Sequence, residues 1–157
     1  MLQALQRIKS NECNYIHVDS NGYSRKSIED QIDFVKDGIE ASKRHTIKNR
    51  DKKADLYAEN VKFVADIIQR CKEKGIKVIL VSTPTLPEYY TLLDDEQVTI
   101  MEDFGNKSAS HYDNVKYINL LKSPLFSKDD FFNSDHLCDN GAKKLTLMIN
   151  DTINNWQ

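Results

Sequence analysis

The segment that decides the fold is Lys77-Val78-Ile79-Leu80-Val81-Ser82-Thr83-Pro84. Its unbroken apolar centre predicts a strand that is covered on both faces, as the strands of a parallel sheet are. The stretch before it, Ala54 to Lys74, carries an apolar stripe at helical spacing and ends in basic residues followed by Gly75. The stripe consists of Leu56, Val61, Val64, Ile67, Ile68 and Cys71. A helix, a glycine and a buried strand in this order form half of a βαβ unit.

On the N-terminal side, the patterns indicate one helix and one linker. Ser27 followed by acidic residues is typical of a helix start, and apolar residues recur at helical spacing up to about Ser42. Lys43 to Lys53 is strongly basic and has a single large apolar residue, which predicts a solvated linker. Farther upstream, Tyr15 to Val18 is short and β-prone and is followed by turn-forming residues.

On the C-terminal side, the chain is expected to alternate once more between helix and strand. We expect an aromatic loop around Tyr89 and Tyr90, a helix through Glu96 to Phe104, a strand over Val115 to Leu120, and a last helix that opens at Asn140. The order helix, strand, helix, strand, helix predicts a three-layer α/β architecture. Only two strands are convincing, and two parallel strands make a poor sheet. Either the N-terminal region supplies further strands, or the chain of 157 residues is the C-terminal part of a longer α/β domain.

Composition limits the partners that we expect. The formal net charge of -2, from 22 basic and 24 acidic side chains, leaves no electrostatic footprint for nucleic acid or an anionic membrane. Cys13, Cys71 and Cys138 are odd in number and widely spaced, which favours neither a disulfide framework nor a zinc site. No segment is apolar enough for a signal peptide or a membrane span, so the chain as written is expected to be cytoplasmic. A missing N-terminal segment could still export or anchor a parent protein.

The stretch with a chemical signature is Asp130 to Lys144, in which His136 is flanked by acidic residues. It lies on a loop between a predicted parallel strand and the last helix, where α/β folds place functional groups. His136-Leu137, with Gly141 and the helix after it, resembles the last block of the SGNH/GDSL hydrolases, a D-x-x-H pattern often followed by H-L-N-x-x-G. The segment Lys77 to Pro84 likewise resembles the penultimate strand of that family.

This resemblance covers roughly residues 54 to 156, and it implies both a fold and a function. The fold is a flavodoxin-like (SGNH hydrolase-like) α/β/α sandwich whose parallel sheet would be incomplete here. The function is that of a serine esterase or acyl-hydrolase that acts on O-acyl esters, for example O-acetyl esters, of a small molecule or carbohydrate. Such chemistry needs a serine, a histidine base, an acid and oxyanion donors, and no cofactor.

By the same resemblance, His136 is the catalytic base. The aspartate that the family carries three residues before the histidine corresponds to Asn133, whose carbonyl oxygen could orient the ring but could not stabilise an imidazolium as a carboxylate does. Asp135 is adjacent to the histidine and could replace the acid only if the loop bends. The candidate substrate-binding residues are Ser82, Thr83 and Tyr89, which follow the predicted strand or lie in its exit loop.

The family's nucleophile and oxyanion blocks have no counterpart upstream. Ser20 and Ser24 lie beside Gly22, and Asn-Gly marks a turn more often than a nucleophile. The remaining histidines, His17, His45 and His111, lack metal-ligand spacing and are expected to be ordinary surface or partly buried residues, so no metal is expected.

Two functions of different classes therefore stay open. The first is an SGNH/GDSL-like hydrolase of which this chain carries the catalytic-histidine end, inactive by itself. The second is a non-catalytic α/β module for assembly or binding that lacks both nucleophile and acid. Because an incomplete sheet exposes a strand edge, a homodimer or a swapped assembly is also expected.

Overall fold

The computed structural model describes residues 32–48 and 50–156. Within these residues the protein is a mixed α/β structure of five α-helices and one two-stranded parallel sheet, which confirms the expected class. The helices are α2 (Phe34–His45), α3 (Ala54–Glu73), α4 (Pro87–Tyr90), α5 (Asp95–His111) and α6 (Asp139–Asn154); the strands are β1 (Val78–Ser82) and β2 (Val115–Asn119). Two 3-10 helices, η1 (Arg50–Lys53) and η2 (Lys128–Asp130), complete the order. The strand expected at Tyr15 to Val18 and the cap expected at Ser27 lie outside the described residues.

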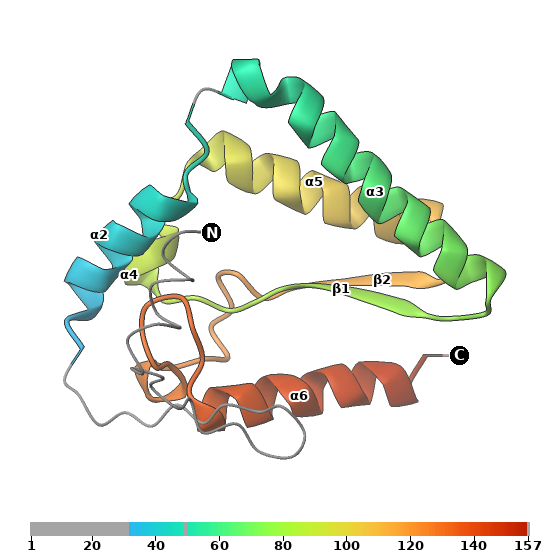
Figure 1. Cartoon of the computed structure of the whole chain (residues 1–157). Coiled ribbons are helices and arrows are strands. Elements are labelled where there is room, and N and C mark those ends of the chain that lie inside the picture. The colour runs from blue at the N-terminus through green and yellow to red at the C-terminus, as the bar shows by residue number, and fades with distance from the viewer. Residues whose placement is uncertain (1–31, 49, 157) are drawn as a thin grey trace, which may run out of the picture.

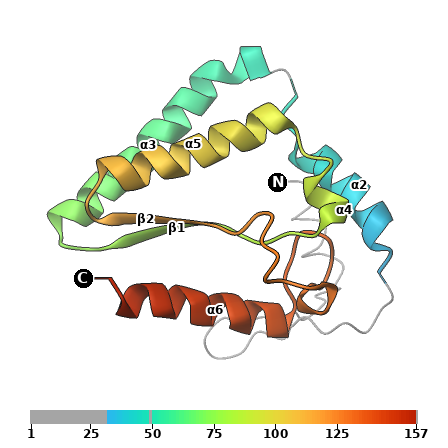
Figure 2. The same cartoon turned by 180° about the vertical axis from the view of Figure 1, so that it is seen from behind.

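The two strands run parallel, as expected. Val78 pairs with Val115 at one end of the ladder and Ser82 with Asn119 at the other. A parallel pair needs a crossover connection, and α4 and α5 supply it. Figures 1 and 2 show α3 and α5 on one side of the strands and α6 on the other. The four residues from Val78 to Val81 are only half-buried, so the described elements cover β1 less completely than its apolar sequence predicts.

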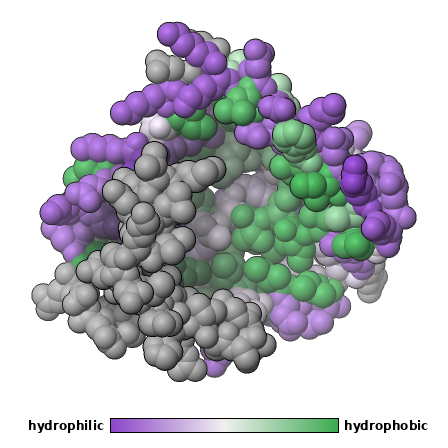
Figure 3. Space-filling view, viewed as in Figure 1, coloured by the Kyte–Doolittle hydropathy of each residue, from purple (hydrophilic) through white to green (hydrophobic). Residues whose placement is uncertain are grey.

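Helix α3 forms where the apolar stripe predicts it, and it ends as predicted. Gly75 has a φ of 69°, a left-handed conformation that glycine adopts without steric cost, and the N–H of Ile76 donates to the carbonyl of Cys71 at 2.8 Å. The stripe is covered only in part. Ile68 is the one buried residue of this helix, Val61, Val64 and Cys71 are half-buried, and Leu56 and Ile67 are each more than half exposed. Phe63, outside the stripe, is also more than half exposed. Figure 3 shows apolar side chains lining a hollow on the face seen there.

Helix α2 extends three residues farther than the sequence predicts. The Asp33 carboxylate accepts from the N–H groups of Val35 and Lys36, both at 3.1 Å, which fixes the first turn. The basic residues 43–45 form the last turn of this helix, where positive charge is favourable, and residues 50–53 form η1. The prediction of a linker over Lys43 to Lys53 is therefore wrong for most of its length.

The predicted aromatic loop is also partly helical. Pro87 opens the short helix α4, since a proline suits the first turn of a helix, and Tyr89 and Tyr90 lie within it. Helix α4 packs directly on α2 through Gly38, where an added Cβ would lie 2.1 Å from the carbonyl oxygen of Glu88. The absence of a side chain at Gly38 thus lets the two backbones touch.

Neighbouring isoleucines of α3 allow a direct test of this burial. Ile68 is 1% exposed and Ile67 is 59% exposed. We expect Ile68→Ala to lower the free energy of unfolding by about 2–4 kcal/mol because it leaves a cavity, and Ile67→Ala to lower it by less than about 1 kcal/mol. Urea unfolding followed by circular dichroism measures both. Equal losses for the two variants would mean that both faces of α3 are buried in solution.

Candidate functional site

The loop that carries His136 is closed by backbone contacts. Phe131 and Leu137 form an isolated antiparallel bridge, and the N–H of Phe132 donates to the carbonyl of His136 at 2.8 Å. Phe131 and Ser134 are fully buried and anchor the loop from within. Because the bridge turns the chain back on itself, residues 133 to 136 are held in a tight bend.

The imidazole of His136 is held at one nitrogen and open at the other. Its Nδ1 lies 2.9 Å from Asn133 Oδ1 and 3.0 Å from Asp135 Oδ1. Asn133 Oδ1 also accepts the N–H of Asp135 at 3.3 Å, which identifies it as the oxygen of the amide. Both neighbours of Nδ1 are therefore acceptors, and the proton of a neutral ring belongs on Nδ1. Among the described residues Nε2 has no hydrogen-bond partner, and the side chain is 54% exposed.

Asp135 lies against the ring from a buried position. Its side chain is only 6% exposed, and its second oxygen, Oδ2, lies 3.7 Å from Nδ1 of His45 at the end of α2. The bend that the sequence analysis required for an Asp135 contact is thus present. The carboxylate lies between two imidazoles, those of His45 and His136.

His45 is fixed in turn by Tyr89. Its Nδ1 lies 2.8 Å from the Tyr89 hydroxyl, and the two rings meet edge to face at a centroid distance of 5.7 Å. Burial raises the pKa of Tyr89 above its usual value, and the negative charge of Asp135 adds to that effect. Sequence reasoning assigned His45 no role, because the residue that it contacts is 90 positions away and no local pattern marks the pair.

A second contact joins α2 to the same loop. Both the N–H of Ser134, at 2.9 Å, and the Ser134 hydroxyl donate to Oδ2 of Asp37. The carbonyl of Ser134 accepts the N–H of Leu86 at 2.9 Å, just before α4. Ser134 therefore attaches the His136 loop both to α2, through Asp37, and to the segment before α4, through Leu86. No pattern in the sequence marks Asp37 or Ser134 for this role.

The predicted substrate-binding residues are placed differently from one another. Tyr89 contacts the His45 and Asp135 cluster, as described above. The hydroxyl of Ser82 lies 2.7 Å from that of Tyr117 on β2 and 3.6 Å from the sulfur of Met101 on α5, so its contacts are with the helix and strand rather than with the His136 loop. Thr83 is exposed beyond the end of β1. Ser20 and Ser24 lie outside the described residues.

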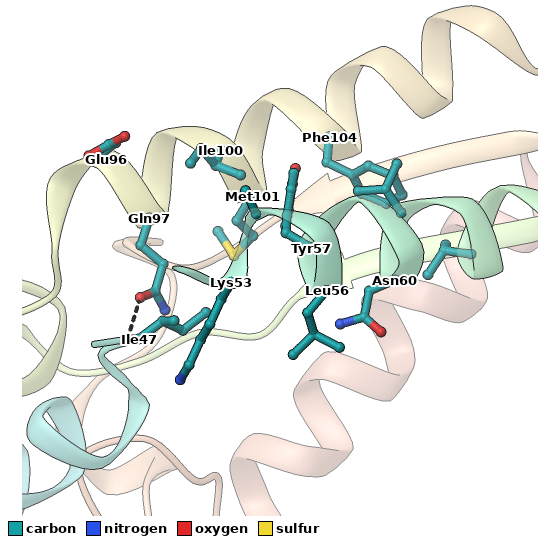
Figure 4. Close-up of a pocket in the computed structure, with 13 residues that line it drawn as sticks. Ile47, Lys53, Leu56, Tyr57, Asn60, Glu96, Gln97, Ile100, Met101 and Phe104 are labelled. Atoms are coloured by element: carbon teal, nitrogen blue, oxygen red, sulfur yellow. Dashed lines mark hydrogen bonds between the residues drawn. The ribbon is translucent and has the colours of Figure 1, made fainter. Parts of the chain in front are cut away.

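A mainly apolar cavity of about 540 Å³ lies between α3 and α5 (Figure 4). Its apolar lining is Ile47, Ala54, Leu56, Tyr57, Val61, Val64, Ile100, Met101 and Phe104, and its polar lining is Lys53, Asn60, Glu96 and Gln97. Gln97 accepts the N–H of Ile47 at 3.0 Å (Figure 4) and donates to the carbonyl of His45 at 2.9 Å. No residue of the His136 loop lines this cavity.

Comparisons with protein-family models, with curated proteins and with solved structures find no significant match. Residues 32–48 and 50–156 contain no group of three or more histidine, cysteine, aspartate or glutamate side chains placed to hold a metal ion. In the same residues, every helix is too short or too polar to cross a membrane. The resemblance to the SGNH/GDSL hydrolases that the sequence motifs suggest therefore stays a prediction.

Asp130 supports the loop at its base. Its carboxylate accepts the N–H of Ser127 at 2.9 Å and the ammonium of Lys144 at 3.0 Å, and its carbonyl accepts the N–H of Cys138. Burial by itself raises the pKa of Asp130. The hydrogen bonds from Ser127 and Lys144 together lower it by more than burial raises it, so the pKa lies below its usual value. The ionised form is thus the form that the folded loop stabilises.

The stability of the folded protein should consequently depend on pH in the acid range. A lowered folded pKa gives stability that is present above the unfolded pKa of about 4 and is lost as the pH falls through the folded pKa. We expect Asp130→Asn to be about 1–2 kcal/mol less stable than wild type at neutral pH, and to lose less stability below about pH 4. Urea unfolding between neutral and acid pH measures both. Asp129→Asn, at an exposed neighbour, should follow wild type; a parallel pH dependence for wild type and Asp130→Asn would contradict this role.

Proposed function

We propose that this chain is the catalytic-histidine end of an SGNH/GDSL-like serine esterase or acyl-hydrolase, with the flavodoxin-like α/β/α fold of that family. The observation that carries the proposal is the state of the His136 ring. Nδ1 is held by the oxygens of Asn133 and Asp135, and Nε2 is open. This is the arrangement that a histidine base needs in a hydrolase with a serine nucleophile.

In the proposed reaction, Nε2 of His136 takes the proton of a serine hydroxyl while the serine oxygen attacks the carbonyl carbon of an O-acyl ester. The resulting imidazolium is stabilised by the carboxylate of Asp135, whereas the neutral Asn133 amide keeps the ring in its tautomer. His136 then returns the proton to the departing alcohol oxygen, and a water or second alcohol releases the acyl group. The acyl group, for example acetyl, and the carbohydrate or small-molecule alcohol are set by parts of the pocket that this proposal leaves open.

The proposal assigns the nucleophile to a serine outside residues 32–156, since no described serine has a hydrogen bond to His136. Ser134, the serine nearest to it in sequence, is fully buried and donates its hydroxyl proton to Asp37. The serine and the oxyanion donors would come from a longer parent chain. Neither metal nor cofactor takes part.

Covalent labelling of serine tests this proposal. We expect a fluorophosphonate probe to give no adduct on this chain, and a single adduct on a longer parent chain that is lost in His136→Ala, because the base that activates serine is then absent. Intact-mass spectrometry measures the adduct. In the parent chain, Asp135→Asn should slow labelling at least about tenfold, and Asn133→Asp should not slow it. A His136-dependent adduct on this chain would place the serine in residues 1–31, and unchanged labelling in His136→Ala would refute the assigned base.

A second candidate function is a non-catalytic module for assembly. The observation that favours it is the apolar surface of α3, where Leu56, Phe63 and Ile67 are 53%, 54% and 59% exposed. Monomeric proteins seldom expose a large contiguous apolar patch. In the described residues β1 also has a paired neighbour on one side only, which leaves an edge for pairing.

Self-association is the first consequence of this second candidate. We expect multi-angle light scattering at micromolar concentration to give the mass of a homodimer, and Phe63→Glu to shift the protein to monomer because it buries a charge in the contact. The adjacent Lys62→Glu, which also introduces an acid on an exposed part of α3, should leave the dimer intact. A wild-type monomer at this concentration would argue against assembly through α3.

A further inference from the structure

We propose that His45 is a positioning residue for His136 and that it acts through the carboxylate of Asp135. The inference rests on the proposed role of His136 as a base. It adds a member from α2, far away in sequence, to the Asn133, Asp135 and His136 group. The order of contacts is Tyr89, His45, Asp135, His136, which runs from a buried phenol to an exposed imidazole.

The burial of Asp135 makes a second partner necessary. A carboxylate that is 6% exposed has lost nearly all of its water and must be compensated by hydrogen bonds or by opposite charge. One oxygen lies 3.0 Å from Nδ1 of His136. The other oxygen lies 3.7 Å from Nδ1 of His45, which is beyond hydrogen-bond distance, and Asp135 also interacts electrostatically with Tyr89. His45 thus adds an electrostatic partner for Asp135 to the contact that His136 makes.

The contact of His45 with Tyr89 shows which nitrogen of the His45 ring carries the proton. The negative carboxylate favours a proton on the imidazole nitrogen that faces it, Nδ1. The same nitrogen lies 2.8 Å from the Tyr89 hydroxyl, whose raised pKa keeps the phenol protonated and neutral, so its oxygen can accept the Nδ1–H. The Nδ1–H of a neutral ring, which carries a partial positive charge, therefore lies on the side of the ring that faces Asp135.

The framework around His45 keeps this geometry fixed. Asp37, two turns earlier on α2, receives both donors of Ser134, the residue before Asp135. Gly38 brings the backbone of α2 against that of α4, which carries Tyr89. The carbonyl of His45 accepts from Gln97 on α5 at 2.9 Å. Helix α2 and the His136 loop are therefore joined to each other, and together they hold Asp135 between His45 and His136.

The test measures the His136 ring itself and needs no serine. Long-range ¹H–¹⁵N spectra of the ¹⁵N-labelled chain, at a pH where a free imidazole is neutral, report the ratio of the Nδ1–H to the Nε2–H tautomer. We expect the Nδ1–H form of His136 to dominate in wild type, and His45→Ala to lower the ratio by about three- to tenfold, as loss of one polar contact would. His45→Asn, whose amide N–H can occupy the place of Nδ1–H, should restore most of the ratio.

Two further variants control this experiment. His111→Ala removes a histidine that meets the ring of Tyr112 edge to face at the end of α5, and it should leave the His136 signals unchanged. Tyr89→Phe keeps the ring that packs on His45 but removes its hydroxyl, and it should shift the ratio in the same direction by a smaller factor. It serves as the second variant if circular dichroism shows His45→Ala to be unfolded.

The outcomes separate this inference from the proposed function. A wild-type ratio in His45→Ala and Tyr89→Phe, together with a changed ratio in Asp135→Asn, would overturn the role of His45 and leave that of Asp135 intact. An unchanged ratio in all three variants would overturn both roles. A shifted ratio in His45→Ala that His45→Asn restores would support the inference even if no serine of the parent chain were labelled.

Discussion

The parallel pairing of β1 with β2 is the constraint on which the other features depend. Because parallel strands end at the same edge of a sheet, the segments that leave Ser82 and Asn119 begin side by side. The first leads into α4 and Tyr89, and the second into η2 and the His136 loop. The N–H of Thr85 donates to the carbonyl of Leu121 at 3.2 Å, which joins the two exits directly. Residues that are far apart in sequence meet at this edge for that reason.

The elements that the sequence predicts well are those whose signal is local. Helix α3, the glycine after it and strand β1 are each predicted from residues inside the element or next to it. The structure has all three where the sequence predicts them. The end of α2 and the short helix α4 were mispredicted. Both lie in contacts between α2 and α4, which are Gly38 with Glu88 and His45 with Tyr89, and these residues are more than 40 positions apart, so composition and periodicity do not encode the contacts.

The candidate site divides in the same way. His136, Asn133 and Asp135 are within four residues of one another, so a local pattern could point to all three. The contacts of Asp135 with His45 and of Ser134 with Asp37 cross about 90 positions and depend on how α2 packs. The chemistry also differs from the pattern it resembles, because the charge beside Nδ1 comes from the residue next to the histidine while an amide stands three residues before it.

Gly38 has no side chain and no part in the proposed chemistry, yet it sets the separation of two functional groups. A methyl group there would overlap the Glu88 carbonyl oxygen and push α2 away from α4, and with them His45 away from Tyr89. In a screen of random variants this position would therefore score as intolerant as the histidine itself. Such a screen would thus single out a residue that touches no substrate, and the reason would be that Gly38 sets the spacing of α2 and α4.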